Sequence, residues 1–256
     1  MTFIDDLGLI EGLLLLAGVL LTYVAVVGWF RMLKGDTKGL HEVLKGSAIP
    51  LGGVGITASL LGVWAEMVWP YAPYAYLGGY NILFTDVILL FGLVLVAFAI
   101  SAYLNLKLQY VGLFALVAGA ITLFYGWTGY GLNYTKEPLN MLLLYAGFGA
   151  AGIMAFPATV LVDHFMGSVE TSPMYWTSEA PNVISRRLGV AVRGVQGLSP
   201  QLKAKAGSSD EIRYHLPRVV SLVLLVFPVF MALASIAAYF FLGSTIPGHL
   251  VPGKTP

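Results

Sequence analysis

Six long apolar segments constrain what this chain can fold into. Each is close to the about 20 residues that a helix needs to cross a bilayer. Only 11% of the residues are charged, whereas soluble domains carry about a quarter. We therefore predict an all-α, polytopic integral membrane protein of the cell membrane, with six transmembrane helices in one bundle that forms a single membrane domain over residues 1–256. The predicted spans cover residues 9–30, 47–69, 82–106, 110–127, 139–165 and 219–242.

The positive charges of the loops predict which way the bundle faces. All but two of the 14 lysines and arginines lie in the loops after the first, third and fifth spans, and the exceptions are Lys136 and Lys254. Cytoplasmic loops carry the excess of basic residues. We therefore expect these three loops inside the cell and both chain ends outside (N-out/C-out).

The long loop over residues 166–216 predicts a surface helix. Apolar residues between Ile184 and Leu198 repeat at helical spacing, and basic side chains lie off that face. Such a helix suits anionic lipid headgroups or the acidic face of a partner protein. The residues predicted to bind lipid or a partner are Arg186, Arg187 and Arg193.

Polar residues and prolines mark several helix ends. Ser47 and Pro50 predict the start of the second span, and Pro138 fits the first turn of the fifth. Pro157 and Pro228 fall inside spans, where we expect them to kink the helices.

The second span carries a face of small residues with an acid at its end. Small residues let helices approach closely inside a membrane, so this face should point into the bundle and not into lipid. It consists of Gly52, Gly55, Ser59 and Gly62, with Glu66 following on the same face. The fifth span has a similar stripe, and we expect the two spans to be close neighbours. That stripe consists of Gly147, Ala151, Ala155 and Ala158.

Three carboxylates near the predicted outer face are candidate sites for a proton, a cation or a ligand. They are Glu11, Glu66 and Asp86, and no predicted span carries a basic residue to neutralise them. Aromatic residues gather at the same end. They predict either an interfacial belt or a cup beside the acids, with Tyr80 and Trp64 in its wall, that takes a cation or an amphipathic molecule. The alternative is structural: Asp86 caps a helix, Glu11 is in water, and Glu66 is buried and protonated.

Histidines gather on the predicted cytoplasmic face. They are His41, His164 and His215, and Asp163 precedes the second of them. Three such residues suit a metal, or two of the histidines a haem. Because no metal motif has the required spacing, we predict no cofactor and keep haem or metal as the alternative to interfacial ion pairs. The absence of cysteine excludes disulfides, thiolate-held iron–sulfur clusters and a cysteine nucleophile.

Two stretches carry a family resemblance: TFIDDL at the start and GFGAAGIMAFPATVLVDHF in the fifth span. Together with the layout of spans over the whole chain, they resemble a family of uncharacterised archaeal and bacterial multi-pass membrane proteins. The resemblance implies a membrane fold, but no activity, cofactor or site residue.

The sequence favours a role without catalysis. It shows no hydrolytic constellation, and no predicted span holds a lysine on which a retinal Schiff base could form. The leading hypothesis is a non-catalytic subunit or scaffold that associates with membrane lipids and with other membrane subunits or further copies of itself. Nucleic acid is not expected as a partner. One alternative is a proton- or cation-linked small-solute permease or channel that uses Glu66 and Asp86. A second is a redox subunit that binds haem or a quinone at the cytoplasmic histidines.

Overall fold

The computed structural model is all-α over the residues that it describes, which are 6–68, 81–135, 137–169 and 218–250. Helices α1 and α2 cover Asp6–Leu33 and Thr37–Val68, and the π-helix η1 (Asn81–Asp86) continues directly into α4 (Val87–Tyr103). Helices α5, α6 and α9 cover Gln109–Gly131, Pro138–Val169 and Arg218–Leu250. With η1 and α4 taken together, the described part consists of six rods.

Five of these rods are long and apolar enough to cross a membrane: α1, α2, η1 with α4, α5 and α6. The described apolar part of α9 is shorter and covers Leu224–Phe240. Large apolar side chains point outward from the rods, as Leu60 and Phe124 do with 66% of their surface exposed. Such surfaces are stable in lipid, so the chain is a multi-pass membrane protein and the all-α prediction is confirmed.

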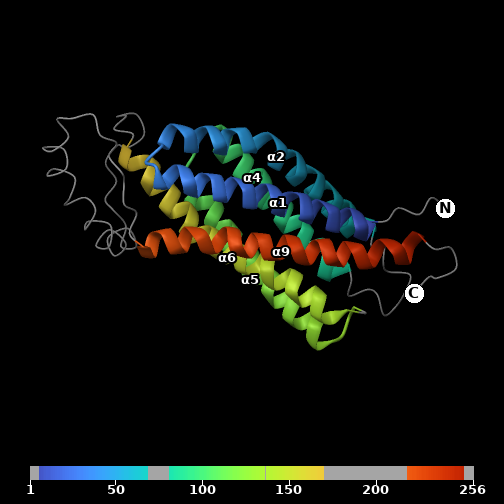
Figure 1. Ribbon diagram of the computed structural model, residues 1–256. Helices are drawn as coiled ribbons and strands as arrows, with labels where there is room; N and C mark the ends of the chain where they lie inside the picture. The colour runs from blue at the N-terminus through green and yellow to red at the C-terminus, as the bar shows by residue number, and fades with distance from the viewer. Residues whose placement is uncertain (1–5, 69–80, 136, 170–217, 251–256) are drawn as a thin grey trace, which may run out of the picture.

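The rods stand in a ring (Figure 1). Going round, α1 contacts α2, α2 contacts α4, α4 contacts α5, α5 contacts α6, α6 contacts α9, and α9 returns to α1. The α4–α5 junction is the loosest of the six. We name the two ends of the ring after residues that lie there. At the Glu66 end, on the right in Figure 1, α1 begins and α9 ends, and the Asp163 end is opposite.

Small residues set the spacing between α2 and α4. A Cβ added to Gly55 would lie 2.8 Å from Leu95 Cβ, and one added to Gly62 would lie 2.7 Å from Leu89 Cβ. These distances are too short for real carbon atoms, so both positions require glycine at this spacing. Inside a membrane no hydrophobic effect drives helices together, and such close approach supplies van der Waals attraction instead.

The close pairing that we expected between the second and fifth spans is not what the ring shows. Helix α2 packs mainly against α4, while α6 packs between α5 and α9. On α6, Gly147 lies against α9, where an added Cβ would be 2.8 Å from Ala234 Cα, and Ala151 is fully buried. Each stripe does border a neighbouring rod, but the neighbour differs from the one predicted.

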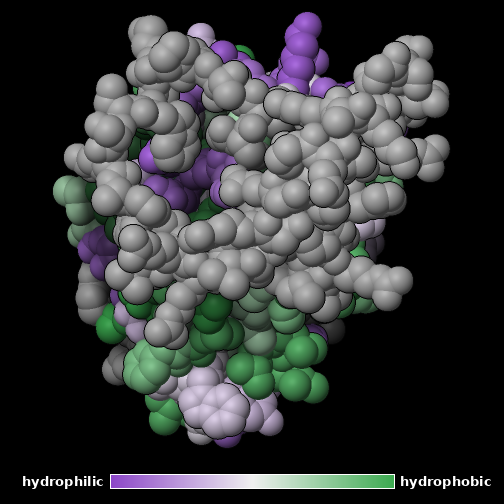
Figure 2. Space-filling view, turned by 90° about the vertical axis from the view of Figure 1, so that its left-hand side faces the viewer, coloured by the Kyte–Doolittle hydropathy of each residue, from purple (hydrophilic) through white to green (hydrophobic). Residues whose placement is uncertain are grey.

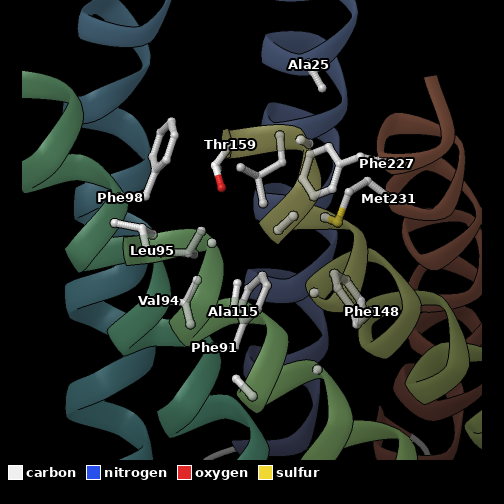
Figure 3. Close-up of a pocket in the computed structure, with 18 of the residues that line it drawn as sticks. Ala25, Phe91, Val94, Leu95, Phe98, Ala115, Phe148, Thr159, Phe227 and Met231 are labelled. Atoms are coloured by element: carbon white, nitrogen blue, oxygen red, sulfur yellow. The ribbon is translucent and has the colours of Figure 1, made fainter. Parts of the chain in front are cut away.

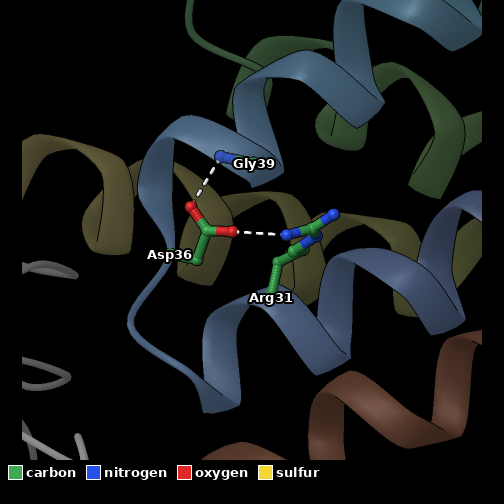
Figure 4. A network of polar contacts seen from close by, with 3 residues as sticks. All are labelled: Arg31, Asp36 and Gly39. Carbon is green, nitrogen blue, oxygen red and sulfur yellow. Dashed lines mark hydrogen bonds and ion pairs between the residues drawn. The ribbon is translucent and has the colours of Figure 1, made fainter. Parts of the chain in front are cut away.

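Helix α2 begins well before the predicted start at Ser47 and Pro50, which lie inside it. Its cap is Asp36, whose Oδ1 accepts a hydrogen bond from the Gly39 N–H at 2.7 Å, while Arg31 Nη1 donates to Oδ2 at 2.6 Å (Figure 4). The hydrogen bond from the Gly39 N–H is the largest cause that lowers the pKa of this carboxyl, and the Arg31 guanidinium is the second. Proline is tolerated inside membrane helices because neighbouring groups satisfy the backbone that it frees.

Candidate functional site: a polar cluster and a central cavity

A cluster of polar side chains lies at the Glu66 end, where three rods meet. Thr85 of η1 donates a hydrogen bond from Oγ1 to Glu66 Oε1 of α2. Tyr125 of α5 donates one from its hydroxyl to Asp86 Oδ2 of η1 at 2.7 Å. We call Glu66, Thr85, Asp86 and Tyr125 the polar cluster.

The π-helical turn accounts for this arrangement. Single π turns within helices are frequent at functional sites, because the wider turn re-aims side chains and frees backbone groups. Here the consecutive residues Thr85 and Asp86 reach different rods. The Leu83 carbonyl accepts a hydrogen bond from the Tyr145 hydroxyl of α6 at 2.6 Å. The turn is therefore held from α2, α5 and α6.

The cluster brings two carboxyl groups together. Among the described residues, the charged neighbour of Glu66 is Asp86 and not a base, and the two carboxyl groups interact electrostatically. Two ionised carboxylates repel each other, and a proton or a bound cation relieves that repulsion. The chemistry open to this cluster is therefore uptake and release of a proton or a cation.

Sequence reasoning named Glu66 and Asp86, and the structure brings these two together. The alternative in which Asp86 caps a helix is wrong, because its side chain makes no capping hydrogen bond and accepts one from Tyr125 instead. Trp64 is 38% exposed on α2, and Tyr80 lies outside the described residues. Tyr125 was not among the predicted site residues, and its only signal was its place among the aromatic residues at this end.

A cavity of about 180 Å³ occupies the interior of the ring (Figure 3). All six rods contribute to its lining, which is almost entirely apolar. Two hydroxyls in the lining already donate within their own helices, from Thr122 to Ala118 O at 2.8 Å and from Thr159 to Phe156 O at 3.0 Å. Glu11 is the one carboxyl of the described lining and is only 1% exposed. The expectation that Glu11 is in water is therefore wrong.

Two aromatic pairs cross the interior of the ring. Phe91 of α4 meets Phe148 of α6 edge to face with ring centroids 5.3 Å apart, and Phe84 of η1 meets Tyr145 of α6 at 6.3 Å. Since α4 and α6 are not neighbours in the ring, these pairs bridge it and narrow the cavity toward the Glu66 end. We call the part between Phe91–Phe148 and the Asp163 end the chamber. Figure 3 shows Ala25, Leu95, Phe98, Thr159, Phe227 and Met231 around it.

Asp163 ties α6 to the start of α5. Its Oδ1 accepts a hydrogen bond from the Leu108 N–H at 3.0 Å, and its Oδ2 accepts one from the Gln109 N–H at 2.7 Å. The first N–H groups of a helix have no partner inside it. Asp163 therefore caps α5 from a neighbouring rod, a role that the sequence analysis did not assign to it.

The predicted histidine set is not assembled in the described part of the chain. No three metal-binding side chains come together there. His41 is half-buried on α2, His164 is exposed on α6, and His215 lies outside the described residues. The basic residues Arg186, Arg187 and Arg193 lie outside them too. Figure 2 views the molecule from the Asp163 end. The hydrophilic side chains that it shows gather in its upper part, over α1 and α2.

Residues 1–180 match DUF981, a family of proteins of unknown function. The match covers more than half of the sequence and agrees with the resemblance that the sequence itself suggested. No curated protein and no solved structure matches the chain significantly.

Proposed function

We propose that this chain, which belongs to the DUF981 family, binds an elongated hydrophobic molecule in its central cavity and does not transform it. The observation that carries this proposal is the apolar cavity lined by all six rods. Atoms that line an empty cavity lose van der Waals partners, and apolar cavities of this kind stay dry and take up hydrophobic molecules.

The dimensions of the cavity favour a slender ligand. Along α1 the lining extends from Ile10 to Met32, which at about 1.5 Å per residue is roughly 30 Å, the thickness of the hydrocarbon core of a bilayer. The volume of about 180 Å³ is below the about 300–1,000 Å³ of sites for drug-sized ligands. A single chain fits both values better than a compact ring system does.

We also propose an orientation, with α9 as the sixth span. The Asp163 end would face the cytoplasm and both chain ends would lie outside. In support, the described basic residues all lie toward the Asp163 end, as the positive-inside rule requires for a cytoplasmic face. They are Arg31, Lys34, Lys38, Lys45, Lys107 and Arg218.

A pair of substitutions on α1 tests the binding function. Ala25→Phe adds a ring inside the chamber, and Val19→Phe adds the same ring where the side chain is 53% exposed on the outer surface. The purified protein is incubated with deuterated palmitic acid in mild detergent, and native mass spectrometry measures the complex. We expect Val19→Phe to bind like the wild type and Ala25→Phe to bind at least about tenfold more weakly. Equal binding by the two variants would contradict the proposal.

The polar cluster favours a second candidate, a proton- or cation-linked permease or channel for a small solute. Glu66→Gln keeps the shape of the side chain and removes its charge, while Glu42→Gln makes the same change at an exposed position of α2. In liposomes, this candidate predicts that ion-linked flux is lost in the first variant and kept in the second. Flux that is unchanged in Glu66→Gln would end it.

A role as a subunit or scaffold of a larger membrane complex stays a prediction, as does a redox role. Extraction in mild detergent tests the first, because a co-purifying chain or a second copy would support it and a lone protomer would count against it. A visible absorption spectrum of the same preparation tests haem.

A further inference from the structure

We propose that the ligand of the cavity is a hydrocarbon chain already dissolved in the bilayer, carried by a membrane lipid or a free fatty acid, and that it enters sideways between α4 and α5. This inference rests on the proposed binding function and adds the chemical class of the ligand and its route.

Apolar side chains lie at both ends of the chamber. Toward the Glu66 end, Phe91 and Phe148 meet across the ring. Toward the Asp163 end, the lining includes Met32, Leu40 and Leu108, each no more than 2% exposed. A molecule that arrived from water along the axis of the ring would have to pass the Phe91–Phe148 pair or displace the layer at the Asp163 end. A molecule in the bilayer faces the sides of the ring instead.

Five of the six junctions of the ring are closed by a glycine in tight contact with the next rod. Gly28 of α1 lies under Leu40 of α2, where an added Cβ would be 3.2 Å from Leu40 Cδ1. Similar or closer contacts occur at Gly18 with Ser235 (α1–α9), Gly62 with Leu89 (α2–α4), Gly119 with Gly149 (α5–α6) and Gly147 with Ala234 (α6–α9). Between α4 and α5 themselves, no described glycine makes such a contact; α5 meets this rod closely at η1, where a Cβ added to Gly129 would lie 3.2 Å from Leu83 Cδ1.

The reason lies in how α4 and α5 use their small residues. On α4, Gly92 faces α2, where an added Cβ would be 2.6 Å from the Ser59 backbone nitrogen. On α5, Gly112 and Gly119 face α6. Other residues of both helices follow helical spacing and border the cavity. They include Val87, Phe91, Val94 and Phe98 on α4, and Val111 and Ala118 on α5.

The α4–α5 junction is fixed at its two ends. At the Asp163 end, residues 104–108 join the two helices directly, and Asp163 holds this connection by its bond to the Leu108 N–H. At the Glu66 end, the Tyr125 hydroxyl bonds to Asp86 at 2.7 Å. Between these points the described residues show no hydrogen bond from one helix to the other.

The middle of the junction coincides with the chamber. Because α4 and α5 run antiparallel, the Tyr125–Asp86 bond sets their register and brings Ala118 to the level of Phe91 and Val94. Ala118 lies two helical turns before Tyr125 on the same face of α5, and its side chain is only a methyl group. A chain passing at this level therefore meets only apolar groups and reaches the chamber at the Phe91–Phe148 pair.

Reversible cross-linking tests this route. The chain has no cysteine, so Val94→Cys combined with Ala118→Cys introduces its only thiols. A short bis-methanethiosulfonate links them across the junction, and a reductant releases the link, so each sample is its own folding control. The protein in phosphatidylcholine nanodiscs is loaded from vesicles that contain deuterated palmitic acid or, in a second arm, phosphatidylcholine with deuterated chains. Native mass spectrometry follows the labelled chain in the complex.

We expect the linked protein to take up the labelled chain at least about tenfold more slowly than the same protein after reduction. The arm that shows uptake identifies the carrier of the chain as a fatty acid or a phospholipid. Uptake at the same rate by linked and reduced protein would overturn the lateral route and leave the binding function standing. Absence of uptake by the reduced protein and by the wild type in both arms would instead overturn the binding function.

Discussion

Asp163→Ala should loosen the Asp163 end of the ring, and the size of the effect follows from the contacts. The substitution removes two hydrogen bonds, to the N–H groups of Leu108 at 3.0 Å and Gln109 at 2.7 Å. The two bonds contribute about 0.5–1.5 kcal/mol each. The cost of losing a helix cap, about 0.5–2 kcal/mol, is a second estimate of the same loss. We therefore expect the free energy of unfolding to fall by about 2 kcal/mol. That is a factor of roughly 30 in the unfolding equilibrium constant.

The measurement is reversible denaturation in detergent micelles, with His164→Ala as the matched control. His164 is the next residue on α6 and is exposed, so its removal should change stability by less than about 0.5 kcal/mol. Asp163→Asn keeps one side-chain carbonyl as acceptor and should fall between the wild type and Asp163→Ala. If Asp163→Ala were no less stable than His164→Ala, the claim that α6 caps α5 across the ring would be refuted.

Three further predictions concern packing, pH and orientation. Gly62→Val should destabilise the α2–α4 contact by about 1–3 kcal/mol, whereas Gly53→Val, with no atom within 4 Å of an added Cβ, should be nearly neutral in the same denaturation assay. Asp36→Ala should cost about 1 kcal/mol at neutral pH. Because the folded state lowers the pKa of Asp36, its contribution is present above the unfolded pKa of about 3.9 and is lost as the pH falls below it, so stability curves of variant and wild type should converge in acid. In intact cells, a membrane-impermeant maleimide should label Tyr134→Cys and not Lys34→Cys, and the reverse would invert the proposed orientation.

The rods themselves could be predicted from the sequence, because lipid demands long apolar helices and leaves few other solutions. The order of the rods could not. The small-residue stripe at Gly147 predicts close approach to some helix, but any rod with a matching surface satisfies it, and the structure pairs it with Ala234 of α9. The start of α2 was misread because Pro50, typical of a first helical turn, sits inside the helix.

The cavity was equally out of reach of sequence reasoning. In a soluble protein, a helix has a polar face toward water and an apolar face toward the core, so its sequence shows which face is buried. In lipid both faces of a rod are apolar. Phe98, which lines the cavity, and Leu93, which is 41% exposed on the outer surface, lie on one helix and give no contrast in hydropathy. The polar cluster was partly visible for the opposite reason, since Glu66 and Asp86 stand out in apolar surroundings. Their partner Tyr125 did not, because it is one of many aromatic residues at that end.

Tyr125 connects the two candidate functions. Its hydroxyl donates to Asp86 of the polar cluster, and the same bond fixes the Glu66 end of the α4–α5 junction through which we propose that the ligand enters. Uptake of a proton or a cation by the carboxyl pair changes the acceptor that Tyr125 sees, and with it the strength of that attachment. Ion binding and lateral access would then both depend on the strength of the Tyr125–Asp86 hydrogen bond. Tyr125→Phe removes the bond and keeps the ring, so it should speed uptake of the phosphatidylcholine chain, whose headgroup does not titrate near neutral pH, and make that rate independent of pH. A rate that stayed pH-dependent in this variant would separate the two functions.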